Sequence, residues 1–83
     1  MKIADKFLKD NDGFSIRLNR HTWLTLENLN TRIEEAVKYE TMAKKIGSDL
    51  GDKFANEWSN TKEFYIELRD ELINFINEKI SNL

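Results

Sequence analysis

Five carboxylates near the C-terminus have the types and spacing best suited to chemistry. Glu63, Glu67 and Glu71 recur every four residues, so they share one face of a helix, and Asp70 and Glu78 lie beside that row. Two carboxyls can act as general acid and general base when a concave pocket holds them in different environments. A chain of 83 residues leaves little room for such a pocket, so we expect these groups to bind rather than to catalyse.

This acidic row repels itself. No lysine or arginine lies four residues from any of its members. Like charges at that spacing destabilise a helix by about 0.2–0.5 kcal/mol per pair. A partner protein with a basic surface would supply the missing cations. The alternatives are a solvated outer face, or ion pairs with lysines from the N-terminal half of the chain.

The remaining composition argues against a catalytic or metal centre. The chain has no cysteine, which excludes disulfides and thiolate metal sites. Its single histidine, His21, lacks the companions of a zinc site and cannot complete a Cys-His pair. We therefore predict no catalytic residue, no bound metal and no cofactor.

Hydropathy and charge are those of a folded protein in aqueous solution. Hydrophobic residues make up 40% of the chain and charged residues 34%. No run of about 18 apolar residues is present and the N-terminus lacks the apolar stretch of a signal peptide, so a cytoplasmic location without membrane contact is expected. Residues 1–47 hold nine Lys/Arg and seven Asp/Glu (net +2), and residues 48–83 hold four and eight (net −4). This balance disfavours nonspecific binding to nucleic acid.

The apolar periodicity predicts a mainly α single domain over residues 1–83, with three to four helices and one short N-terminal β-strand over residues 14–18. Gly47 is typical of a helix end, and Asn60, with Glu63 three residues later, is typical of a helix start. The predicted helices cover residues 2–9, residues from 19 or 22 to 46 with a bend at 39–41, a short stretch from 48 to 58, and residues 60–83.

The helix faces predict the core. A helix that packs on a core buries residues at i, i+3, i+4 and i+7. Trp23 falls on that face at the start of the first long helix. The nine predicted core residues are Leu26, Leu29, Ile33, Val37, Phe54, Phe64, Leu68, Leu72 and Phe75.

A second apolar row runs beside the core stripe of the last helix. Ile66, Ile73 and Ile80 recur every seven residues. With this row the helix is apolar over more than half of its circumference, so it needs a cover on two sides. We therefore expect self-association, most simply as a homodimer, through these three isoleucines.

The strand over residues 14–18 needs a neighbour to pair its backbone groups. That neighbour is a second copy, a partner's sheet, or a weakly alternating segment of this chain; otherwise the segment is an extended loop. The run from Phe14 to Asn19, followed by an amphipathic helix, resembles the opening of ribbon–helix–helix repressors. In that family paired strands insert alternate polar side chains into the major groove. The resemblance implies that Ser15, Arg17 and Asn19 contact DNA bases.

A second resemblance is to small, acidic, phage-encoded anti-CRISPR inhibitors. It rests on a short N-terminal helix that leads through Asp and Gly to a strand, on the acidic surface, and on the C-terminal pattern Lys53-Phe54, Trp58 and Glu63-Phe64-Tyr65. Members of that group bind a CRISPR effector, often by placing carboxylates where nucleic acid should lie. The Asn- and Lys-rich, proline-free composition also suits a phage or mobile-element protein.

The sequence therefore predicts a non-catalytic binding protein. The first hypothesis is a phage or mobile-element inhibitor that engages a basic or nucleic-acid-binding host protein through its acidic last helix. One alternative is a dimeric ribbon–helix–helix-like repressor, and only under this alternative is DNA a partner. A further alternative is a structural or assembly protein that self-associates.

Overall fold

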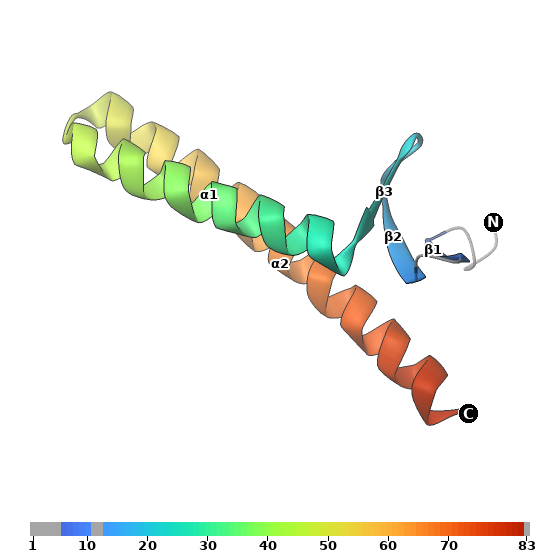
Figure 1. Ribbon diagram of the computed structural model, residues 1–83. Helices are drawn as coiled ribbons and strands as arrows, with labels where there is room; N and C mark the ends of the chain where they lie inside the picture. The colour runs from blue at the N-terminus through green and yellow to red at the C-terminus, as the bar shows by residue number, and fades with distance from the viewer. Residues whose placement is uncertain (1–5, 11–12, 83) are drawn as a thin grey trace.

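A three-stranded antiparallel sheet and two long helices make up the part of the chain that the structure, a computed structural model, describes: residues 6–10 and 13–82 (Figure 1). The helices run side by side as a hairpin, and the sheet lies at the open end of that hairpin (Figure 1). The elements are β1 (Phe7–Asp10), β2 (Gly13–Asn19), β3 (Thr22–Thr25), α1 (Leu26–Ile46) and α2 (Asp49–Ser81).

This architecture corrects the predicted fold class, because two helices and three strands replace three to four helices and one strand. The helix predicted over residues 2–9 is wrong where the structure describes it: residues 7–9 belong to β1, and residues 2–5 lie outside the described part. The long helix begins only at Leu26, because Thr22–Thr25 form β3. α1 is continuous through residues 39–41, where the sequence predicts a bend. The helix start predicted at Asn60 is also wrong, because α2 passes through it without interruption.

The strand predicted over residues 14–18 exists and is the central strand of the sheet. In the antiparallel register Ile16 lies opposite Phe7 of β1 and Leu24 of β3. Directly opposite residues point to the same face, so these three apolar side chains face the helices together. The neighbours that the strand requires therefore come from this chain.

Thr25 joins the sheet to the helices. It pairs with Ser15 as the last residue of β3 and is also the N-cap of α1. Its hydroxyl accepts a hydrogen bond from the Asn28 N–H, and its own N–H donates to the Asn28 side-chain oxygen, both at 3.1 Å. This reciprocal pair is a capping box. At the other end α1 stops at Gly47, as predicted, because Gly47 adopts the left-handed conformation with φ 68°.

The core lies where the sheet meets the base of the helical hairpin. Ile16, Leu24, Leu29 and Leu72 are buried there and contact one another. Leu29 and Leu72 were predicted as core residues and are confirmed. Half-buried apolar side chains pack around this cluster: Phe7, Phe14, Leu18, Leu26, Tyr65, Leu68 and Ile76.

Farther along the hairpin the two helices meet through small residues. Ala36 and Ala43 of α1 and Gly51 and Ala55 of α2 are buried. A Cβ atom added at Gly51 would lie 2.7 Å from the Ala43 carbonyl oxygen, so the backbones are too close for a larger side chain. Large apolar residues are therefore displaced to the sides of the interface. Three predicted core residues are consequently exposed, and their assignment is wrong: Val37, Phe54 and Phe64.

Candidate interaction surfaces

The five acidic residues singled out in the sequence lie on the outer face of α2. All five side chains are exposed, and the buried Leu72 lies on the opposite side of the helix. From the first to the last, the row covers about 22 Å of a straight helix. The structure thus brings these residues together on one surface: Glu63, Glu67, Asp70, Glu71 and Glu78.

Two of these carboxylates have a cation nearby. Glu71 is 3.0 Å from the Lys6 ammonium, and Asp70 is 4.0 Å from Arg69 Nε. The N-terminal half therefore neutralises the row at one position. Within residues 6–10 and 13–82, the other three carboxylates have no lysine or arginine within ion-pair distance: Glu63, Glu67 and Glu78.

The isoleucine row lies along one side of α2. Ile66 is half-buried, whereas Ile73 and Ile80 are exposed. The row is therefore covered best near the middle of the helix and least toward the C-terminus. Its role in self-association stays a prediction.

The three residues predicted to read DNA have different surroundings. Ser15 is only 7% exposed. The side-chain oxygen of Asn19 accepts a hydrogen bond from the His21 N–H at 3.0 Å, within the turn between β2 and β3. Arg17 is exposed, and its guanidinium lies 4.8 Å from the ring centroid of Trp23, the residue opposite it on β3. The outer face of the sheet thus pairs Arg17 with Trp23 and leaves Ser15 little access.

The sequence assigned Trp23 to a helix face, and its place on the sheet was missed. A signal was present, because Arg20 and His21 form a two-residue connection between two short runs that contain apolar and polar residues. Two-residue connections are typical of β-hairpins. The four residues of β3 were too few to show alternation clearly.

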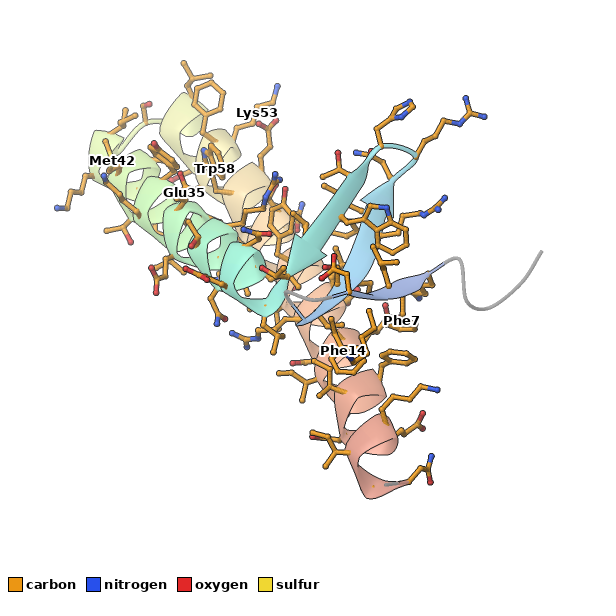
Figure 2. The ribbon with its side chains drawn as sticks, turned by 45° about the vertical axis from the view of Figure 1, so that its right-hand side comes forward. Phe7, Phe14, Glu35, Met42, Lys53 and Trp58 are labelled. Carbon is orange, nitrogen blue, oxygen red and sulfur yellow. The ribbon has the colours of Figure 1, made fainter. Side chains whose placement is uncertain are left out.

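A further surface that the sequence did not assign lies along the hairpin near its closed end. The rings of Tyr39 and Trp58 contact each other across the two helices, with centroids 4.9 Å apart. Figure 2 shows Met42 on α1 near the closed end and Trp58 on α2. Trp58 is half-buried and the other members are exposed. We call this surface the aromatic flank: Tyr39, Met42, Ile46, Leu50, Phe54 and Trp58.

Glu40 links the two helices electrostatically. Its carboxylate is 2.9 Å from the Lys62 ammonium of α2 and 3.3 Å from the Lys44 ammonium of α1. The hydrogen bond from Lys62 has the larger effect and the one from Lys44 the smaller. Both favour the charged carboxylate, so they hold the pKa of Glu40 below its usual value. Glu40 and Lys44 lie on the side of α1 that carries apolar residues earlier in the helix. The ion pairs allow charged side chains at these positions.

Among the residues that the structure describes, no three His, Cys, Asp or Glu side chains gather as a metal-binding group. Neither α1 nor α2 is both long enough and apolar enough to span a membrane. A shallow, mostly apolar depression lies where the sheet meets the end of α2, near Phe14 in Figure 2. It is lined by Lys9, Phe14, Phe75, Lys79 and Ile80.

Comparison with protein-family models, with curated proteins and with solved structures gives no match for this chain. The resemblances to anti-CRISPR inhibitors and to ribbon–helix–helix repressors therefore stay predictions.

Proposed function

We propose that this protein is a non-catalytic binding protein that contacts a basic surface of a partner protein through the outer face of α2. The observation that carries the proposal is the exposure of Glu63, Glu67 and Glu78 on one helix face without a cation from the described residues. Each of these carboxylates can therefore pair with a cation of a partner, and complementary charge raises the rate and specificity of association.

The rigidity of α2 supports this role. The helix continues for 33 residues, and its core-facing side is held by the sheet and by α1. The backbone positions of the carboxylates therefore keep a fixed spacing, and little backbone freedom is lost when a partner binds. A row of this kind suits a groove that normally holds phosphates. We propose an inhibitor of a nucleic-acid-binding host protein as the class, in line with the anti-CRISPR resemblance.

A short oligoarginine peptide provides a defined probe of this surface. We expect the wild-type protein to bind it at low ionic strength, and the double variant Glu63→Lys/Glu67→Lys to bind about tenfold more weakly or not at all. Glu71 is left unchanged because it pairs with Lys6. Isothermal titration calorimetry measures both affinities.

The matched control is Glu34→Lys/Glu35→Lys on α1, which changes the net charge equally at two exposed positions. We expect it to retain most of the affinity, because the acidic row remains. Equal losses in both double variants would show a general charge effect and contradict the assignment to α2. Absence of peptide binding by the wild type would also contradict it.

A second candidate function is DNA binding by the outer face of the sheet. Residues 6–10 and 13–25 carry four Lys/Arg and one Asp, a net +3, whereas α2 carries four Lys/Arg and eight Asp/Glu, a net −4. The sheet is thus the basic part of the described chain. Arg17 and Trp23 lie together on it, and β-sheets can enter a DNA groove with such side chains.

An electrophoretic shift with duplex DNA distinguishes the two functions. If the sheet binds DNA, Arg17→Ala weakens the complex, and the affinity of the wild type falls steeply with salt. The exposed residue Lys45, at the far end of α1, provides the control, because Lys45→Ala removes the same charge. Our proposal expects no shift by the wild type. Tight, sequence-selective duplex binding would overturn the inhibitor proposal in favour of this second function.

A further inference from the structure

The close approach of α1 and α2 leaves large apolar side chains outside their interface. Ala36, Ala43, Gly51 and Ala55 fill the space between the helices. Since no larger side chain fits at Gly51, the helices stay close together there, and the six members of the aromatic flank lie beside the interface. A two-helix hairpin has no third element to cover this side, and the sheet lies at the opposite end of the hairpin (Figure 1).

The aromatic flank is continuous across both helices. Tyr39 and Trp58 contact each other across the hairpin, so the contributions of α1 and α2 meet. The α1 members are spaced by three and four residues and the α2 members by four and four. These are the spacings of side-chain ridges that pack against another helix.

The exposed area is close to what a specific interface needs. The five exposed members are between 38% and 62% accessible. At roughly 200 Å² for a large side chain, they leave roughly 500 Å² uncovered in each copy. Complete burial of these side chains in two copies would remove roughly 1,000 Å² from water, near the lower limit for a biological interface.

We propose that the aromatic flank is the interface between two copies of this chain. The two hairpins pack flank to flank about a twofold axis, so that four helices enclose the apolar side chains as a four-helix bundle does. A second copy suits this surface because it brings an apolar, helical face of the same length and curvature. The proposal is independent of the acidic row, which lies on another face of α2.

Analytical ultracentrifugation of matched variants tests the proposal. Leu50 in the aromatic flank and Ile80 in the isoleucine row are each 59% exposed, so a charge at either position costs the folded monomer little. We expect the wild type to sediment as a dimer at about 100 µM, with a dimer dissociation constant at least about tenfold lower than that of Leu50→Glu. Ile80→Glu should remain as dimeric as the wild type.

A fluorescence measurement provides a second readout that does not depend on a charged variant. In a Trp23→Phe background Trp58 is the remaining tryptophan. We expect its emission to shift to longer wavelength on dilution, because dissociation exposes the ring to water. Circular dichroism checks that Leu50→Glu keeps the helix content of the wild type, and Met42→Lys replaces it if it does not.

Three outcomes would overturn the proposal. One is a wild-type monomer at about 100 µM, which leaves the flank for another partner. Another is a Leu50→Glu protein that is folded and still dimeric. The third is dissociation by Ile80→Glu but not by Leu50→Glu, which would place the interface at the isoleucine row.

Discussion

Single atoms set the distance between the two helices at Gly51. A Cβ at this position would meet the Ala43 carbonyl oxygen at 2.7 Å and the Ile46 Cβ at 2.9 Å. The first of these neighbours belongs to the backbone of α1, which cannot move without displacing the helix. The close packing of the hairpin therefore depends on this residue.

We predict that Gly51→Ala destabilises the protein. Alanine favours a helix over glycine by about 1 kcal/mol, but separating the helices costs more, so the free energy of unfolding should fall by about 1–3 kcal/mol. Urea denaturation measures the change. The exposed helical position Asn56 serves as the control, because Asn56→Ala gains helix propensity without a clash and should not destabilise. A Gly51→Ala protein more stable than the wild type would contradict the prediction.

A pH dependence follows from Glu40. Its pKa is lower in the folded protein than the usual value of 4.5, so its ion pairs stabilise the fold at neutral pH and are lost as the pH falls through the folded pKa. The urea midpoint of the wild type should therefore exceed that of Glu40→Gln near pH 7, and the difference should shrink in acid, well below the usual pKa of 4.5, as the Glu40 carboxylate becomes protonated. The same difference at both pH values would exclude this contribution.

At the scale of residues, the sequence correctly predicted those features that depend on side-chain hydrophobicity or on a special backbone angle. Gly47, Leu29 and Leu72 were assigned correctly for that reason. Small residues such as Gly51 and Ala55 give little signal in a hydrophobic pattern, so the close helix interface that they form was missed. The displacement of the aromatic flank, which depends on that interface, was missed with it.

At the scale of elements, short segments were the hardest to predict. The spacing of Trp23, Leu26 and Leu29 matches a helix period, although the first of these residues lies in β3. The acidic row was placed correctly on one helix face because its helix was long and strongly periodic. Asn60 looks like a helix cap, but it lies exposed within α2, where a polar side chain costs little.

Proline substitution tests the continuity of α2. If α2 started near Asn60, Thr61 would be a first-turn residue that tolerates proline. In a continuous helix Thr61→Pro removes an interior hydrogen bond and should cost about 3 kcal/mol or more. Asp49→Pro, at the first position of α2, should be tolerated. Urea denaturation compares the two, and equal stabilities would contradict a single helix.

At the scale of the whole molecule, the chain is long and thin, with extents of 52 × 25 × 18 Å. Such a shape buries few side chains fully, and Ile16, Leu29 and Leu72 are the largest in the described residues. A fold with this little buried apolar surface gains substantially when a partner covers more of it.

The melting temperature should therefore depend on protein concentration. Dimerisation stabilises the folded state by mass action, so a tenfold increase in concentration should raise the melting temperature by several degrees. Differential scanning calorimetry over a concentration series measures this slope. Leu50→Glu should melt at a temperature that does not vary with concentration, and a flat series for the wild type would contradict dimer-linked stability.

Thr25 makes the sheet and the hairpin a single mechanical unit. It closes the last strand pair and caps α1, with no linker residue between the two roles. A tilt of the sheet therefore rotates α1 as a lever about 30 Å long, and the closed end of the hairpin moves farther than the sheet itself. If the sheet binds a ligand that tilts it against α2, the geometry of the aromatic flank should change, and by thermodynamic reciprocity pairing of two copies at that flank should change the affinity for that ligand.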